Sequence, residues 1–280
     1  MNVPGRFLIS ICCLISVTFV AASVVFSMPA GTGVEKPENE SARNKSTAEL
    51  NMNKKDDISG TSYYDLFLNS LRIGKATIEV EKEGDDFMLK VAARARSNLS
   101  KLYSYKGKVA MSANPIQPTQ AVVEEQAGSK HKITLIEFPE PDRVTAVQIE
   151  TRRGKKPKRT EKEFSSESFV LDPFSTVFLL RSLNWAAGTT EVFDIFTGNK
   201  QYELQLFCRG ETALEVEGTV RDVWEIVLQT RSLEEPRKKK MSGYVVYLSR
   251  DSRRDILKVT GKAKIGRIVA SMRNSERDEG

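Results

Sequence analysis

The sequence is poor in the residues that metal and disulfide chemistry require. Its 280 residues contain one histidine and three cysteines. Two of the cysteines, Cys12 and Cys13, lie in an apolar run near the N-terminus, which leaves His131 and Cys208 in the rest of the chain. A zinc site needs three or four such ligands. We therefore expect no metal, no cofactor and no intramolecular disulfide.

Recognisable catalytic motifs are also lacking. A serine nucleophile would need His131 as its base, but no Gly-x-Ser-x-Gly turn is present. Acidic pairs such as Glu124-Glu125 are sequence neighbours, so their side chains would point to opposite faces of a strand. Distant carboxylates could still converge, since glycoside hydrolysis requires only two. We expect a protein that is not an enzyme, with His131 on the surface and Cys208 buried in a strand.

The N-terminus indicates export. Arg6 precedes residues 7–26, which carry no charge. The apolar part of a cleaved signal has roughly 7 to 15 residues, whereas a spanning helix needs about 20, so a cleaved signal peptide and a retained signal anchor both stay open. Either one places the body outside the cytoplasm, because the positive charge is on the N-terminal side. We expect a periplasmic protein, tethered to the inner membrane if the segment is retained.

Composition divides the chain into four segments. Residues 1–27 form the signal peptide or anchor, and residues 28–60 have too few large apolar side chains to offset the entropy of ordering, which predicts a disordered linker. Residues 61–273 have the composition of a single β-rich domain. Residues 274–280 form a polar tail.

The body has the period of β-structure. From Thr61 onward, apolar residues alternate with polar ones and turn residues recur at short intervals, which predicts antiparallel strands. Strands are expected at 62–68, 71–81, 87–95, 104–112, 118–126, 130–138, 143–151, 191–197, 200–208, 212–217, 220–230, 243–249, 254–260 and 264–272. So many similar strands with hairpin connections predict a mainly β fold, either a curved antiparallel sheet or a partly open β-barrel.

One segment has the helical period instead. Asp172 is a suitable N-cap and Pro173 a suitable first helical residue. An apolar stripe follows at helical spacing, made of Phe174, Val177, Phe178, Leu180 and Leu183. We expect one amphipathic helix packed on the sheet, either as a fixed plug or as a mobile lid.

Positive charge is concentrated in two predicted loops. The chain has 43 Lys and Arg against 37 Asp and Glu. Six basic residues surround Gly154 and Pro157, as expected at a hairpin tip: Arg152, Arg153, Lys155, Lys156, Lys158 and Arg159. A second basic run occupies residues 237–240. These loops suit an anionic membrane surface or an acidic glycan, or they only aid solubility. Nucleic acid is not expected, because no aromatic residues interleave the basic runs.

Three groups of residues, in order along the chain, resemble a known family. They are Tyr64-Asp65-Leu66-Phe67-Leu68-Asn69 with Ile73-Gly74-Lys75-Ala76, then Asp172-Pro173-Phe174-Ser175 with Leu180-Arg181, and finally Val246-Tyr247-Leu248-Ser249-Arg250-Asp251-Ser252-Arg253-Arg254 with Gly266-Arg267-Ile268. Over about residues 61–273 the chain resembles the exported bacterial family "domain of unknown function 3108". It departs at Tyr247, where the family often has tryptophan. The resemblance implies a periplasmic β-rich domain and brings no established activity or catalytic residues.

Two functions fit these observations. In the first, a non-enzymatic envelope protein holds a lipid or lipid-linked glycan in an apolar groove under the helix, lined by Phe174, Val177, Phe178 and Leu180, while the basic loops face an anionic membrane. In the second, the protein is an interaction scaffold whose interior is filled by its own side chains, and an edge strand or basic loop binds an envelope protein. An empty apolar space beneath the helix would favour the first, and a filled interior the second.

Overall fold

The computed structural model describes residues 58–96, 103–113, 116–166, 169–234, 242–263 and 266–273. The predicted signal segment 1–27, nearly all of the predicted linker, the polar tail 274–280 and the basic run 237–240 lie outside these ranges. The β-rich body begins at the end of the predicted linker, where Ile58 is buried and Gly60 opens the first strand. Within the described residues, no helix is long and apolar enough to cross a bilayer.

The described strands form one sheet with a simple path. They are β1 (Gly60–Leu68), β2 (Leu71–Glu83), β3 (Asp86–Ala95), β4 (Tyr103–Ala113), β5 (Ile116–Ala127), β6 (Lys130–Glu140), β7 (Arg143–Arg152), β8 (Lys158–Ser165), β9 (Val170–Leu171), β10 (Thr190–Phe196), β11 (Gln201–Val216), β12 (Thr219–Ser232), β13 (Ser242–Ser249), β14 (Ile256–Ala263) and β15 (Gly266–Arg273). Their order in the sheet is β8-β7-β6-β5-β4-β3-β2-β1-β15-β14-β13-β12-β11-β10-β9. From β1 in the middle of the sheet, the chain thus runs to one edge, crosses to the other edge and returns beside its first strand.

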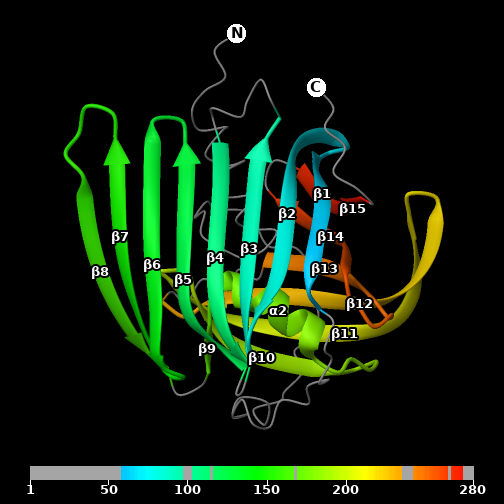
Figure 1. Ribbon diagram of the computed structural model, residues 1–280. Coiled ribbons are helices and arrows are strands. Elements are labelled where there is room, and N and C mark those ends of the chain that lie inside the picture. The colour runs from blue at the N-terminus through cyan, green and yellow to red at the C-terminus, as the bar shows by residue number, and fades with distance from the viewer. Residues whose placement is uncertain are drawn as a thin grey trace.

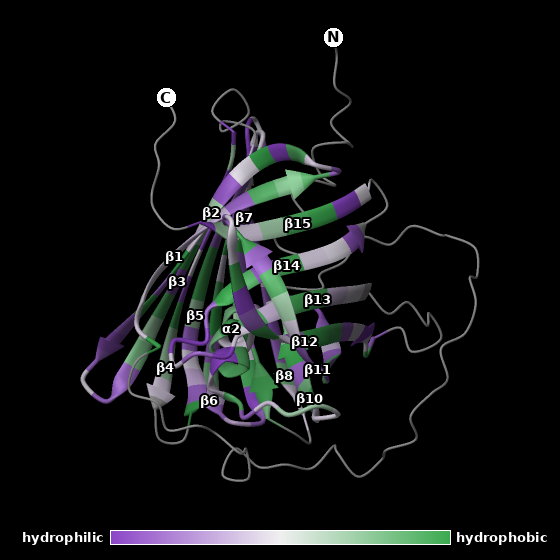
Figure 2. Ribbon diagram, turned by 90° about the vertical axis from the view of Figure 1, so that its right-hand side faces the viewer, coloured by the Kyte–Doolittle hydropathy of each residue, from purple (hydrophilic) through white to green (hydrophobic). Residues whose placement is uncertain are grey.

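The sheet bends around one helix, α2 (Pro173–Ser182). Strands β2–β8 form one wall, β9–β13 form a second wall that crosses it, and α2 lies between them (Figure 1). Apolar and polar residues alternate along many of the strands (Figure 2), and the buried apolar residues of both walls and of the helix form one core cluster. Register shifts within the ladders, for example between Ala110 and Met111 and between Cys208 and Gly210, mark the irregularities that bend such strands.

The two edges of the sheet approach each other at one end. The rings of Phe164 on β8 and Phe196 on β10 stack with centroids 6.0 Å apart. Lys162 Nζ donates a hydrogen bond of 2.7 Å to the carbonyl oxygen of Asn199, and Ser166 Oγ donates one of 2.5 Å to Asp194 Oδ2. The Val170 N–H on β9 also donates a 3.1 Å hydrogen bond to the Pro141 carbonyl oxygen in the β6–β7 turn. Scattered contacts rather than a backbone ladder therefore hold this end together, as in a partly open barrel.

The fold class predicted from the sequence is confirmed: the protein is mainly β, with a large curved sheet and one helix. Neighbouring strands are antiparallel except for the short parallel pair β9–β10. The prediction missed β8 because Phe164 is its one large apolar residue, so the alternation is weak. It also divided β11 into two strands at 200–208 and 212–217, where the structure has one strand with a bulge.

Candidate functional site

Helix α2 begins as the sequence predicts. The backbone N–H of Phe174 donates a 2.7 Å hydrogen bond to Asp172 Oδ1, and the N–H of Ser175 donates one of 3.3 Å to the same oxygen. The Ser175 hydroxyl donates to the Asp172 carboxylate and accepts from the Asp172 N–H, which completes a capping box. Burial raises the pKa of the Asp172 carboxyl, although these hydrogen bonds act in the opposite direction. The prediction that Asp172 caps this helix is confirmed.

An amphipathic helix was predicted, with its polar side facing solvent. In the structure the polar side is covered as well, because all ten residues of the helix are buried. Its polar side chains turn back to the backbone instead of reaching solvent. Thr176 Oγ1 donates to the Asp172 carbonyl oxygen at 3.2 Å, and Ser182 Oγ donates to the Phe178 carbonyl oxygen at 3.0 Å. The helix is thus covered by protein on every side, including its polar one.

The four side chains predicted to line a groove all pack inside this enclosure. Phe174, Val177, Phe178 and Leu180 are each at most 2% exposed. The Phe174 ring lies on the backbone of Gly107 in β4, where a Cβ atom would come within 2.2 Å of it, and its centroid is 5.7 Å from that of Tyr105. The rings of Phe178 and Phe87 are 4.8 Å apart. Protein side chains therefore occupy the space between the helix and β3–β4.

A buried ionic cluster holds the C-terminal end of the helix. Arg181 Nη2 lies 3.2 Å from Asp255 Oδ1, and both side chains are less than a tenth exposed. Arg181 also donates to the carbonyl oxygens of Arg253 and Arg254, at 2.8 and 3.1 Å. The Arg254 guanidinium donates to the Leu183 carbonyl oxygen just beyond the helix. Burial lowers the pKa of Arg181 and raises that of Asp255, while their mutual attraction opposes both shifts.

Sequence reasoning missed this cluster as a unit, although Arg181, Arg253 and Arg254 lie in the motifs that carry the family resemblance and Asp255 follows the last of them directly. Leu180-Arg181 belongs to the helix motif, and Arg253-Arg254 belongs to the turn before β14. The two parts are more than seventy residues apart in sequence. Only the return of the chain beside the helix brings them together, so their pairing had no local signal.

The six basic residues of the first predicted loop do gather at a hairpin tip, between β7 and β8. All six are exposed, as are Gly154 and Pro157 between them. Two of them have acidic partners on their own strands: Arg152 lies 2.7 Å from Glu150, and Arg159 lies 2.7 Å from Glu161. Within the described residues, the other four make no ion pair: Arg153, Lys155, Lys156 and Lys158. The tip therefore projects a net positive charge.

The other residues considered for chemistry have structural surroundings. Cys208 is fully buried in β11, as predicted, and burial raises the pKa of its thiol. The side chain of His131 is about a third exposed, and its Nε2 lies 2.9 Å from Glu124 Oε1. Among the residues that the structure describes, there is no group of three or more His, Cys, Asp and Glu side chains suited to a metal ion.

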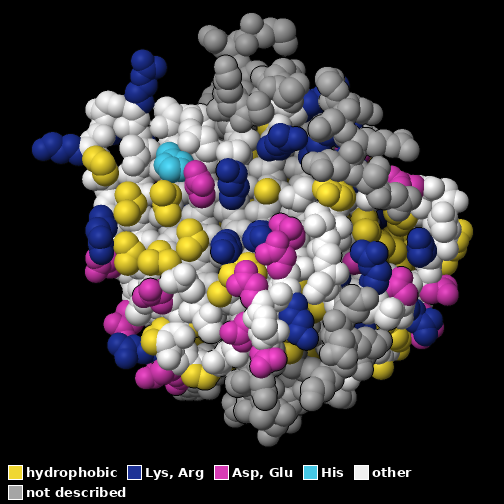
Figure 3. Space-filling view, viewed as in Figure 1, with side chains coloured by type: hydrophobic (Ala, Val, Ile, Leu, Met, Phe, Trp, Pro, Cys, Tyr) yellow, Lys and Arg dark blue, Asp and Glu magenta, His cyan; other side chains and the backbone are white. Residues whose placement is uncertain are grey.

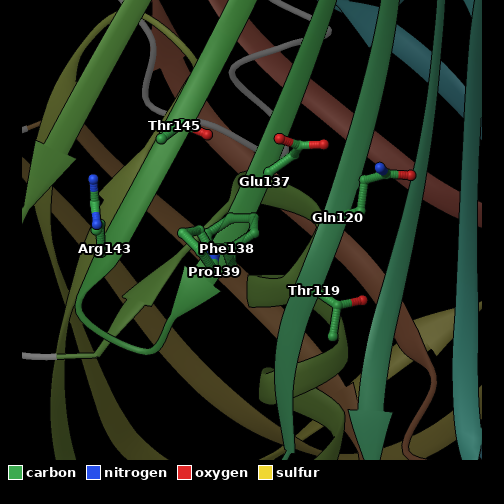
Figure 4. Close-up of a pocket in the computed structure, with 7 residues that line it drawn as sticks. All are labelled: Thr119, Gln120, Glu137, Phe138, Pro139, Arg143 and Thr145. Carbon is green, nitrogen blue, oxygen red and sulfur yellow. The ribbon is translucent and has the colours of Figure 1, made fainter.

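An open depression of about 460 Å³ lies on the outer face of β5–β7 (Figure 4). It is lined by Thr119, Gln120, Glu137, Phe138, Pro139, Arg143 and Thr145. It forms beside the register shift between Glu137 and Glu140. The guanidinium of Arg143, which lines the depression, donates a 2.7 Å hydrogen bond to Glu163 Oε1 on β8. Its charged groups are thus already partly engaged within the protein.

The model of the family "Protein of unknown function (DUF3108)" matches residues 63–273, from β1 to the end of β15. The chain belongs to this family. The resemblance seen in the sequence is thereby confirmed. No curated protein matches the chain significantly.

Solved structures with a similar arrangement share little sequence with this member of the DUF3108 family. One is a β-barrel-like protein of the domain of unknown function DUF1849 from Brucella abortus, with a TM-score of 0.47, 8% identity and coverage of 76% of this chain and 94% of that one. The second is the hypothetical lipoprotein YmcC from Escherichia coli K12, with a TM-score of 0.32, 7% identity and coverage of 81% and 92%. The third, described as a lipoprotein of Parabacteroides distasonis, has a TM-score of 0.27, 7% identity and coverage of 76% and 94%.

Proposed function

We propose that this chain is a non-enzymatic protein of the cell envelope that contacts an anionic membrane surface through the tip of the β7–β8 hairpin. In this proposal, the protein acts as a scaffold whose interior is filled by its own side chains. The observation that carries it is the set of six exposed basic residues at one tip, four of them without an ion pair among the described residues. The uncharged N-terminal run after Arg6 supports export to the envelope.

The filled interior supports a scaffold over a lipid carrier. A carrier needs an apolar space that its ligand can enter. Around α2, that space holds the rings of Phe174 and Phe178 against Gly107 and Phe87. A lipid chain could enter only if the helix left its position, which would expose a helix that is buried on every side.

The hairpin tip supports contact with anionic lipid headgroups. Near an anionic surface, each Lys or Arg contributes about 1 kcal/mol of binding free energy. Three of the four unpaired residues, Arg153, Lys155 and Lys156, would therefore contribute about 3 kcal/mol together, which is roughly a hundredfold in partitioning. Added salt should weaken this contact, since the Debye length falls from about 10 Å at 0.1 M to about 3 Å at 1 M.

Vesicle sedimentation of the full chain tests this contact. We compare vesicles of phosphatidylcholine alone with vesicles that also contain phosphatidylglycerol, because an apolar N-terminal segment would bind both whereas the tip would prefer the anionic ones. The test variant reverses three charges at the tip, Arg153→Glu, Lys155→Glu and Lys156→Glu. The control reverses three exposed charges on the β2–β3 and β14–β15 hairpins, Lys82→Glu, Lys262→Glu and Arg267→Glu.

We expect the wild type and the control variant to prefer anionic vesicles, and the tip variant to lose that preference. Equal loss in both variants, or no preference in the wild type, would overturn the proposed contact. Native mass spectrometry of the protein purified from membranes tests the filled interior separately. We expect the mass of the protein alone, and a lipid that remains bound would favour the groove under α2 instead.

A further inference from the structure

The outer face of the sheet carries an apolar patch over β5–β7. Val122, Leu135 and Val147 lie side by side in one row across the three strands, and Ile133 and Ile149 are paired in the next row. Val122, Ile133 and Ile149 are 37–40% exposed. The space-filling view shows apolar side chains gathered on this part of the wall, beside the histidine (Figure 3). We call these five residues the β5–β7 patch.

The core does not explain this patch. On the same strands, Ala121, Ile136 and Ala146 point to the opposite face and are buried in the core. An antiparallel sheet with one solvated face normally carries polar residues there. Strands β2 and β3 follow that rule, since Lys90 lies 2.5 Å from Glu81 and 3.7 Å from Glu79 on their outer face. A contiguous apolar patch in such a place marks a contact surface.

The first apolar row of the patch ends in charges of opposite sign. On β4, Lys106 and Lys108 stand at the ends of the two apolar rows, since Lys108 is paired with Val122 and Lys106 with Glu124. On β8, Glu161 is paired with Val147 at the other end of the first row. Strands β4 and β8 are each two strands away from β6 in the sheet. The first apolar row therefore ends in a cation on β4 and in a carboxylate on β8, at equal distances from the central strand of the patch.

We propose that the β5–β7 patch binds a second copy of this chain, sheet face to sheet face, about a two-fold axis that runs parallel to β6. Two sheets packed in this way lie about 10 Å apart with strand directions within about 30° of each other. The axis would place Leu135 opposite its own copy and Val122 opposite Val147. It would also place Lys108 opposite Glu161, twice per dimer, because a two-fold contact is self-complementary.

The same symmetry brings Lys106 opposite Arg159, but each of these cations has a carboxylate beside it. Lys106 is paired across the ladder with Glu124, and Arg159 forms an ion pair of 2.7 Å with Glu161. Those same carboxylates, Glu124 and Glu161, border the patch and would repel an anionic membrane. The mixed charge around the patch thus favours a copy of the protein over a lipid surface on this face.

The partner should approach the face of the sheet and not its edge. Five of the 8 residues of the edge strand β8 are charged: Lys158, Arg159, Glu161, Lys162 and Glu163. Charged side chains on an edge strand oppose strand-to-strand association. Five strands spaced about 4.8 Å apart, with four rows of outward side chains about 6.7 Å apart, cover roughly 640 Å². Stable interfaces bury about 800 Å² per partner, so we expect a weak, concentration-dependent dimer.

Cross-linking of variants with one added cysteine, in membranes, tests the geometry on the full chain. Leu135→Cys should give a dimer with a short bismaleimide, because the two-fold axis places it opposite its copy. The matched control is Val220→Cys on β12, which is 67% exposed and outside the patch. The cross-linking yield of the unsubstituted chain, measured in parallel, accounts for its own cysteines, of which Cys208 is buried. Cross-linking of Leu135→Cys no stronger than that of Val220→Cys would overturn the proposal.

Charge exchange in the Leu135→Cys background tests the pairing itself. Lys108→Glu and Glu161→Lys should each lower the yield of dimer, by about two- to tenfold for a pair of exposed ion pairs. The double variant should restore the yield, because the opposite charges again face each other. A double variant with as little dimer as the single variants would overturn the proposed axis. These substitutions leave Arg153, Lys155 and Lys156 unchanged, so this test and the vesicle test can fail independently.

Discussion

Helix α2 and the β5–β7 patch are two apolar regions that differ in their exposure to solvent. The helix has its four predicted lining residues at most 2% exposed, between two walls of the sheet. The patch is a third or more exposed at three of its five residues, on the outside of one of the same walls. Apolar content is similar in the two regions, so their difference lies in what covers each one.

The two regions separate residues that determine folding from residues available for binding. The covered region should control the stability of the monomer, because its side chains lose their contacts when truncated. The uncovered region should contribute little to monomer stability and should matter when another molecule covers it. Substitutions of similar size in the two regions make this separation measurable.

The largest effect is expected inside the helix enclosure. Phe174→Ala removes the ring that packs on Gly107 and should lower the free energy of unfolding by about 3 to 5 kcal/mol, measured by urea denaturation. Ile149→Ala in the patch, at low protein concentration, should change it by about 0.5 kcal/mol. Similar losses for the two variants would show that the patch belongs to the folding core.

A second large effect is expected at the buried ionic cluster. Asp255→Ala leaves the Arg181 guanidinium buried without its carboxylate and should cost about 3 kcal/mol of unfolding free energy. The control is Glu163→Ala, which breaks the exposed pair with Arg143 and should cost at most about 1 kcal/mol. Equal costs in urea denaturation would mean that Arg181 is satisfied by the carbonyl groups of residues 253 and 254 alone.

A smaller effect with a defined pH dependence is expected at the helix N-cap. Asp172→Ala should lower the free energy of unfolding by about 0.5 to 2 kcal/mol, since it removes the side-chain acceptor of two backbone N–H groups. Because burial raises the folded-state pKa of Asp172 above its ordinary value of 3.8, the folded protein binds this proton more tightly than the unfolded chain. That contribution is complete below pH 3.8 and is lost as pH rises through the folded-state pKa.

Denaturation of the wild type and of Asp172→Asn across this pH range measures that sign. The stability of the wild type relative to the variant should be greater at acidic pH than at neutral pH. A relative stability that rises with pH would show that the cap hydrogen bonds outweigh the effect of burial on the carboxylate.

The smallest effect on stability is expected at the basic tip. Reversal of the charges at Arg153, Lys155 and Lys156 should change the free energy of unfolding by only about 0.5 kcal/mol, because exposed charges contribute little to folding. The melting temperature should therefore change little. Thermal unfolding followed by circular dichroism measures this change. A large drop in the melting temperature would show that the tip contributes to folding. Vesicle binding would then be compared in a tip variant whose stability has been restored.

Much of the fold followed from local patterns. The period of two in β1–β7 predicted the strands, and Asp172-Pro173 predicted the start of the helix, because alternation and capping depend on residues close in sequence. Strand β8 was missed because its charged residues hide the alternation. The bulge that keeps β11 as one strand was missed because a break in alternation is also typical of a turn.

The candidate surfaces followed the sequence only in part. The basic tip was predicted, since its six residues are neighbours around a glycine and a proline. The β5–β7 patch was not predicted, because its five residues lie on three strands. Each of these strands carries apolar residues on both faces, so no strand by itself shows that its outward apolar residues adjoin those of its neighbours. Only the register of the ladder shows that Val122, Leu135 and Val147 form one row.

By itself, the sequence determined the family, the β-rich body, the capped helix and the basic hairpin, since each depends on short-range patterns or on motifs in order. The tertiary structure alone decided three further features. It enclosed α2 on its polar side as well, it paired Arg181 with Asp255 across more than seventy residues, and it left one apolar face of β5–β7 uncovered. The physical reason is that burial depends on which walls the curvature of the sheet brings together, and that curvature is a property of the whole sheet.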